Sequence, residues 1–155
     1  MTLSSDPNLN PSRPINVTMV LADHAQVADS KLFVAGGGWT DITGAAPFAL
    51  AMVIEVPIEQ TGMKHKFEVD LIDAHGQPAL MPTPQGMTPV HHEMEMEIER
   101  PDDDSVPSTF VNPFVIKSGP MPVAPADYEW RLSVDGEARE HWRLPFRVHP
   151  APQQT

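Results

Sequence analysis

The chain has 155 residues, of which 41% are hydrophobic, 18 are proline and none is cysteine. This length suits one domain, and so many prolines favour many short elements over long helices. Twenty-one acidic against ten basic residues give a net charge of -11, which disfavours nucleic acid and anionic membranes as partners, while the lack of cysteine excludes disulfides and thiolate metal sites.

The two ends of the chain are predicted to lie outside the folded domain. Residues 1–14 are expected to be a flexible N-terminal arm and residues 150–155 a disordered tail, on either side of a single domain over residues 15–149. The arm lacks the basic and apolar segments of a secretory signal, and no run approaches the roughly 18 apolar residues that cross a bilayer. The sequence therefore predicts a cytoplasmic protein without a membrane partner.

Residues 17–39 are the stretch around which the chain is organised. Two apolar runs flank a polar turn at residues 28–31, which predicts a β-hairpin. The glycine triplet that follows permits a bend or bulge, and the carboxylate near the end of the first run is interpreted as accepting backbone hydrogen bonds. The residues assigned to shape this hairpin are Asp23, Asp29, Gly36, Gly37, Gly38 and Trp39.

The middle of the chain contains two further strands. Residues 48–57 are almost continuously apolar and lie between prolines, which predicts a central strand buried on both faces; a turn of buried helix is the competing interpretation. Residues 64–73 alternate apolar and polar side chains, as in a strand with one face in water. Residues 78–89 contain four prolines and are expected to form a surface loop with little regular structure.

Residues 91–99 have the most regular alternation in the chain, with methionine and isoleucine predicted to face the core and glutamate to face solvent. Residues 110–116 predict a shorter strand, and Pro113 places it at a sheet edge or at a break. Residues 118–126 are again rich in proline. Between these strands, Asp102 to Asp104 is interpreted as a solvated acidic turn, with a weak calcium site as the less favoured alternative.

The last unit is a second hairpin, which runs from Tyr128 to Val148 and turns at Asp135 and Gly136. The chain is thus predicted to contain about eight strands with regular turn signals, the pattern of an all-β antiparallel β-sandwich, either immunoglobulin-like or a jelly roll.

The two hairpins carry a resemblance. Residues 21–39, together with residues 128–136 and 145–148, are similar to a family of small bacterial proteins of unknown function, and the similarity covers residues 16–149. This family often has Asp-Gly at the first turn, where this chain has Asp29 and Ser30. Serine is less comfortable than glycine at positive φ, which could change the type of turn. The resemblance implies one complete domain and no particular activity or cofactor.

His91 and Glu93 are the candidate metal ligands, because they lie on the same face of a predicted strand. The neighbouring His92 points to the opposite face, so a third ligand must come from a distant histidine such as His24, His65 or His141. The competing and favoured interpretation is that both histidines lie at a strand end near solvent. No cofactor is expected.

Two other patterns fail as catalytic motifs. Asp23 and His24 are adjacent on a strand and point to opposite faces, so they do not form a dyad, and no nucleophile elbow accompanies them. The glycine triplet lacks the Gly-Lys-Ser/Thr of a phosphate-binding loop.

The glutamates of residues 91–99 form a row of like charges that requires water or opposing cations. We expect some of three arginines to lie across from Glu95 and Glu97, or this face to dock a basic partner. The arginines are Arg131, Arg143 and Arg147.

The sequence thus favours a non-enzymatic binding module that acts through a protein partner or through self-association. Its contacts would come from the loops at residues 78–89 and 118–126, or from edge pairing of residues 110–116. The alternatives are a metal-dependent enzyme or small-ligand binder that uses His91 and Glu93, and a structural subunit of a phage or other particle.

Overall fold

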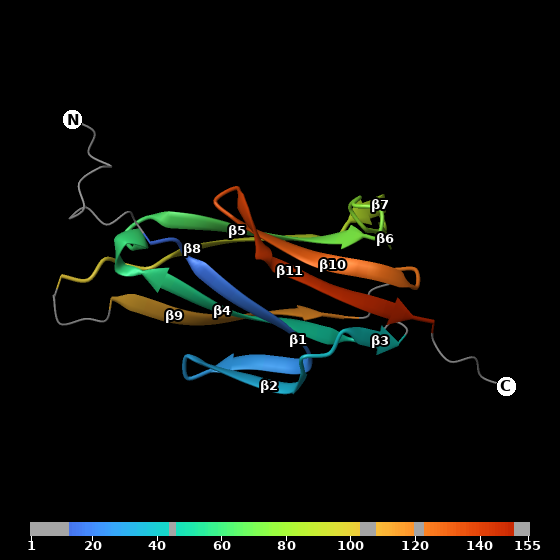
Figure 1. Cartoon of the computed structure of the whole chain (residues 1–155), viewed down its shortest axis with the longest axis horizontal. Helices are drawn as coiled ribbons and strands as arrows, with labels where there is room; N and C mark the ends of the chain where they lie inside the picture. Colours follow the sequence, from blue (N-terminus) through green and yellow to red (C-terminus); the bar gives the residue numbers. More distant parts are fainter. Residues whose placement is uncertain (1–12, 44–45, 103–107, 120–122, 151–155) are drawn as a thin grey trace.

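Two β-sheets pack face to face in the computed structural model of the chain, which describes residues 13–43, 46–102, 108–119 and 123–150 (Figure 1). The first sheet contains, in spatial order, β2 (Lys31–Gly37), β1 (Asn16–Ala28), β4 (Phe48–Pro57) and β9 (Thr109–Ser118). The second contains β3 (Asp41–Thr43), β11 (Glu137–His149), β10 (Ala126–Val134), β5 (Lys64–Asp73) and β8 (His91–Glu97). A separate hairpin pairs β6 (Leu80–Thr83) with β7 (Gly86–Pro89).

The strand arrangement confirms the predicted all-β sandwich. Neighbouring strands are antiparallel except for β3, which pairs in parallel with the end of β11. The described residues contain eleven strands where about eight are predicted, and the three additional ones are β3, β6 and β7. Only η2 (Ile58–Gln60), a single turn of 3-10 helix, interrupts the strands over the same residues, and no helix there is long and apolar enough to cross a membrane.

The core fills the space between the two sheets with the inward side chains of alternating strands. The largest fully buried side chains are Trp130, Trp142, Phe67, Leu21, Leu50, Met52, Ile54, Leu71 and Leu132. At one end Trp39 packs edge-on against Phe48 and Phe146, with ring centroids 5.7 and 6.3 Å away. Trp39, assigned from sequence to the first hairpin, therefore connects that hairpin to both sheets.

The central strand β4 is buried on both faces, as predicted, because a third layer covers its outer side. After pairing with β4 through Ala22, β1 turns back and continues with β2 as a hairpin beneath the first sheet (Figure 1). Ala25 of this segment packs on Ala49 and Ala51 of β4, and all three are essentially inaccessible to solvent. We call residues 23–37 the folded-back hairpin; small alanines on the covered face let it approach closely.

The predicted irregular loop at residues 78–89 is wrong, because β6 and β7 form a hairpin there. Pro82 pairs with Met87, and Thr83 pairs with Gly86, which has a φ of +108° at the turn. Proline is tolerated because both strands of a two-stranded ribbon are edges, where a missing N–H costs no ladder bond.

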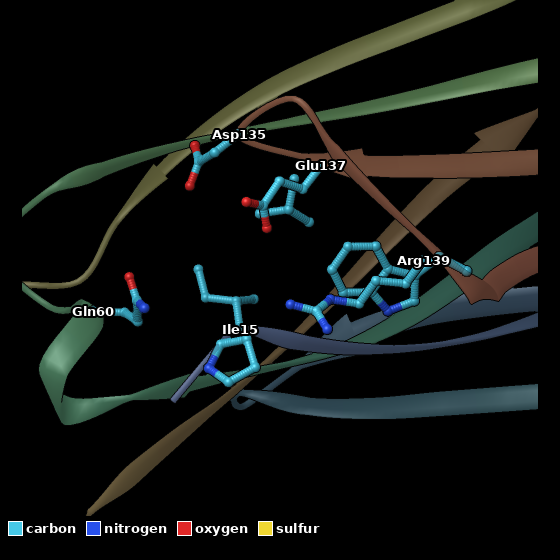
Figure 2. A pocket seen from close by; sticks show the side chains of 8 residues that line it. Ile15, Gln60, Asp135, Glu137 and Arg139 are labelled. Carbon is cyan, nitrogen blue, oxygen red and sulfur yellow. The ribbon is translucent and has the colours of Figure 1, made fainter. Parts of the chain in front are cut away.

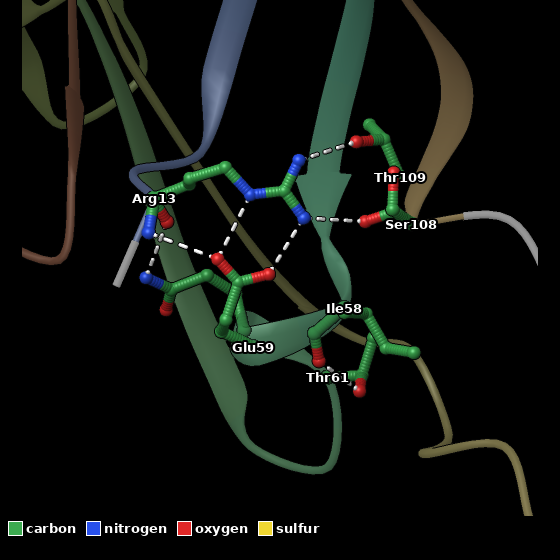
Figure 3. Close-up of polar contacts among 7 residues, drawn as sticks. Arg13, Ile58, Glu59, Thr61, Ser108 and Thr109 are labelled. Carbon is green, nitrogen blue, oxygen red and sulfur yellow. Dashed lines mark hydrogen bonds and ion pairs between the residues drawn. The ribbon is translucent and has the colours of Figure 1, made fainter. Parts of the chain in front are cut away.

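Arg13, near the start of the described residues, connects the chain to Glu59 and Ser108 (Figure 3). Its guanidinium donates to both carboxylate oxygens of Glu59, at 2.9 and 2.6 Å, and to the carbonyl of Ser108 at 2.8 Å. The pKa of Glu59 falls to about 2, chiefly because of the hydrogen bond from Arg13. Of the expected arm and tail, residues 1–12 and 151–155 lie outside the described residues.

Candidate functional site

The tip of the folded-back hairpin is a two-residue turn. Asp29 and Ser30 have φ values of +52° and +59°, and Ala28 pairs with Lys31 around them, as in a type I′ turn. The predicted turn position is therefore correct, and Ser30 adopts the positive φ that glycine usually supplies. The second hairpin turns in the same way at Asp135 and Gly136, with φ values of +52° and +82°.

The glycine triplet lies beside the bend of β1. Gly36 has a φ of +64°, and the carboxylate of Asp23 lies where its side chain would be. Gly37 lies under Val34, and the N–H of Gly38 donates to the carbonyl of Leu21 at 2.8 Å. The pairing continues from Ala22–Gly37 to His24–Ala35 without an inserted residue, so the triplet produces a bend and not a bulge.

β2 presents an apolar edge to solvent. Among the described residues it is hydrogen-bonded only to β1, on one side, and nearly every one of its residues is exposed. Phe33 and Val34 are 51% and 41% exposed, and Val27 on the neighbouring strand is 43% exposed. Clustered exposed apolar side chains on an open strand are typical of surfaces that pair with another chain.

The other three edges of the two packed sheets carry features that prevent such pairing. β8 presents its glutamates to solvent, β9 contains Pro113 and Lys117, and β3 has only three residues. Charges, proline and shortness are the usual devices that protect an edge. Apart from Lys31 at its first position, β2 has none of them.

A second candidate site lies on the outer face of β5 and β8. Here His91, predicted as a ligand together with Glu93, hydrogen-bonds that carboxylate through Nε2 at 2.9 Å and Asp70 through Nδ1. Glu68 Oε2 lies 3.8 Å from the same Nε2. The hydrogen bonds with Glu93 and Asp70 raise the pKa of His91, and that with His91 lowers the pKa of Glu93.

The distant histidines expected to complete a metal site are not part of this cluster. His65 is buried, with its ring nitrogens 2.7 Å from Asp135 Oδ2 and from the carbonyl of Gln60, and His141 Nε2 lies 3.0 Å from Asn16 Oδ1. His24 belongs to the folded-back hairpin. The third group near His91 is instead Glu68. The alternation of residues 64–73 predicts that Glu68 points to solvent, but its proximity to His91 depends on the pairing of β5 with β8, which the sequence pattern does not give.

The predicted arginine partners of the glutamate row are wrong. β5 lies between β8 and β10, so Glu95 pairs with Lys66 and Glu97 with Lys64. The three arginines are on β10 and β11, where Arg131 contacts Glu129 and Arg147 contacts Asp127. Of the acidic turn at Asp102 to Asp104, the last two residues lie outside the described residues.

A pocket of about 400 Å³ opens beside the second hairpin turn (Figure 2). Its labelled lining residues are Ile15, Gln60, Asp135, Glu137 and Arg139. The guanidinium of Arg139 points into the pocket and lies 5.2 Å from the ring centroid of Trp142. Its buried Nε has no hydrogen-bond partner within the described part of the chain. The pocket thus combines a stacked cation with two carboxylates.

The fold and these surfaces define an all-β sandwich whose first hairpin is folded back over one sheet. Residues 17–149 match a family of unknown function, DUF6941, and the chain belongs to that family. No curated protein matches the chain.

Proposed function

We propose that the protein is a binding module that associates with a second copy of itself through β2. The observation that supports this proposal is the contrast among the four edges of the two packed sheets, within the described residues. Three of them carry charges, proline or a very short strand, whereas β2 offers a seven-residue edge with exposed Phe33 and Val34. Antiparallel addition of a strand to this edge satisfies its open N–H and C=O groups and places side chains of the second strand beside Phe33 on one face and beside Val34 on the other.

The sequence of β2 is self-complementary in one register. If two copies pair about a two-fold axis centred on Val34, Phe33 lies across from Ala35 and Leu32 across from Gly36. Phe33 and Leu32 then face small residues, Val34 faces Val34 of the other copy at the axis, and every contact is made twice, as in an isologous interface. Lys31 lies across from Gly37, so the two lysines stay at opposite ends of the paired strands.

The charge of the chain is compatible with this contact. A net charge of -11 on each copy opposes association at long range. However, salt screens charges separated by more than about 8 Å at physiological ionic strength. Because β2 contains only one charged residue, Lys31, the approaching strands meet little local repulsion. Association is therefore expected to strengthen as salt is added.

Sedimentation equilibrium tests the proposal over roughly a hundredfold range of protein concentration. We expect the mass to rise from 17.1 kDa toward twice that value. Phe33→Lys adds a charge to the middle of β2, which is uncharged between Leu32 and Gly37, and it should keep the protein monomeric. Val111→Lys is the matched control, because Val111 is 64% exposed on the β9 edge, and it should dimerise like the wild type.

Two results would contradict the proposal. One is a wild-type protein that remains monomeric at every concentration. The other is a folded Phe33→Lys variant that associates as strongly as the wild type, with far-ultraviolet circular dichroism used to verify folding. If Val111→Lys alone abolished association, the interface would lie at β9, the edge that the sequence favours.

A further inference from the structure

The pairing of β5 with β8 places complementary charges opposite each other except at one position. Lys64 faces Glu97 and Lys66 faces Glu95, but the next outward pair is Glu68 with Glu93. Like charges directly opposite on neighbouring strands are destabilising. A local rule broken within an otherwise consistent ladder is typical of a functional position.

We propose that Glu68, His91 and Glu93 bind a divalent transition-metal ion, for which zinc is the probe. One ligand atom from each of the three residues lies within 4.8 Å of the other two. From His91 Nε2, the distances are 2.9 Å to Glu93 Oε1 and 3.8 Å to Glu68 Oε2. Ligand atoms about 2 Å from a tetrahedral zinc ion are separated by roughly 3.3 Å, so small side-chain adjustments suffice.

The hydrogen bond from His91 to Asp70 prepares the imidazole for this role. With Nδ1–H donating to Asp70 Oδ1, the proton that a metal ion displaces is the one on Nε2, and the neutral ring then presents its lone pair on the nitrogen that faces both glutamates. A carboxylate on the outer nitrogen of a metal-bound histidine is the common arrangement, because it fixes the ring and its tautomer. Asp70 is therefore a positioning residue, not a ligand.

Lys66 orients the two glutamates in a corresponding way. Its Nζ lies 3.7 Å from Glu93 Oε2 and 3.9 Å from Glu68 Oε1. These are the oxygens that do not face His91, so each carboxylate directs one oxygen toward the lysine and the other toward the proposed ion. All three ligands are thus held by neighbours on two paired strands, which are more rigid than loops.

The donor set selects the class of ion. One imidazole and two carboxylates suit zinc and related transition metals, whereas calcium and magnesium prefer oxygen ligands alone. Two carboxylates balance the charge of a divalent ion bound to a neutral imidazole. The three ligand side chains are partly exposed, between 28% and 50%, so a fourth position is open to water or to a group from a partner.

Zinc binding to the purified full-length protein tests the proposal by calorimetry and by elemental analysis after dialysis. We expect one zinc per chain, and at least a tenfold loss of affinity in each of His91→Ala and Glu93→Gln. Asp70→Asn should lower the zinc affinity roughly 10–100-fold, as expected when the residue that positions a metal ligand is removed. Glu95→Gln and His75→Ala are the controls, because both residues are outside the cluster, and they should bind like the wild type.

The proposal is overturned if the wild type retains no stoichiometric zinc, or if a folded His91→Ala variant binds as tightly as the wild type. Equal losses in Glu95→Gln and Glu93→Gln would also overturn it, because they would indicate diffuse attraction to an acidic face. The same titration on Phe33→Lys separates this site from the proposed interface. That variant should bind one zinc whether or not the protein dimerises.

Discussion

The carboxylate of Asp23 lies so close to Gly36 that a Cβ added to the glycine would be 2.2 Å from Asp23 Oδ2. This contact is at the point where β1 leaves its pairing with β4 and turns back with β2. Gly36 is required there for two reasons, the positive φ of +64° and the approach of the carboxylate. The position of the folded-back hairpin, and with it the exposed edge of β2, depends on this pair.

Replacing Gly36 with alanine should therefore lower the free energy of unfolding by about 2–4 kcal/mol. The left-handed backbone costs about 1–2 kcal/mol for an L-residue, and the overlap with Asp23 adds to it. Urea denaturation followed by tryptophan fluorescence measures the loss.

Gly38→Ala is the matched control for this variant. Gly38 also has a positive φ, +88°, but no atom of the described residues lies within 4 Å of its added Cβ. The Gly38→Ala variant should lose only the cost of a left-handed backbone at an L-residue, about 1–2 kcal/mol of the free energy of unfolding. Equal losses in the two variants would show that the contact with Asp23 is unimportant.

Local sequence pattern predicts most strands of this protein accurately. The central run at residues 48–57 and the alternating run at residues 64–73 coincide with β4 and β5. Both hairpin turns are correct because small and acidic residues tolerate a positive φ. The sequence does not predict strands β6 and β7, because their prolines favour a loop. Proline is compatible with these strands only because both are sheet edges, which the sequence pattern does not reveal.

The candidate sites depend on spatial order, which local pattern does not contain. Alternation brings His91 and Glu93 to one face, but only the adjacency of β5 and β8 adds Glu68 and Asp70. The same missing information makes the arginine prediction wrong. The folded-back hairpin has one indirect signal, the apolar character of both faces of β4, which requires a covering layer.

Removing the carboxylate of Asp135 should destabilise the protein by about 1–3 kcal/mol, because a buried ring nitrogen loses its partner. His65 is 5% exposed, and its Nδ1 lies 2.7 Å from Asp135 Oδ2. The other oxygen of Asp135 accepts the N–H of Lys66 at 2.8 Å. Asp135→Ala is the test, read by thermal and urea unfolding.

Asp135→Asn provides the comparison, because asparagine keeps an acceptor and tolerates the φ of +52°. It should lose less stability than Asp135→Ala. Burial alone would raise the pKa of Asp135, but hydrogen bonds from His65 and Lys66 hold it below the usual 3.8. The ionised carboxylate therefore stabilises the folded protein above pH 3.8, and this stabilisation is lost as the pH falls through the lower folded pKa. The free energies of unfolding of the wild type and of Asp135→Asn should therefore converge in acid. A constant difference at every pH would contradict this.

The carboxyl group of Glu59 should titrate at about pH 2 in the folded protein. The folded pKa is lower than the usual 4.5, so the stabilisation from the ionised group is complete above about 4.5 and is lost as the pH falls through about 2. Carbon-detected NMR of the side-chain carboxyl group measures this value directly. Because the pair with Arg13 is exposed, added salt should raise the measured pKa.

Arg13→Ala identifies the cause of this shift. Without the guanidinium, the pKa of Glu59 should return toward 4.5. Arg147→Ala removes a different exposed arginine, which pairs with Asp127, and should leave the pKa of Glu59 near 2. A Glu59 that titrates near 4.5 in the wild type would show that the contacts of Arg13 do not form in solution.

Replacing Ser30 with glycine should stabilise the protein by about 0.5–1 kcal/mol. Serine at a φ of +59° carries a left-handed cost of about 1–2 kcal/mol, and glycine removes it while losing about 0.5–1 kcal/mol more chain entropy on folding. Ser30→Ala keeps a Cβ at the same φ and should give no gain. Urea unfolding of the three proteins measures the difference. If Ser30→Gly were no more stable than Ser30→Ala, the turn at Asp29 and Ser30 would not hold both residues at positive φ in solution.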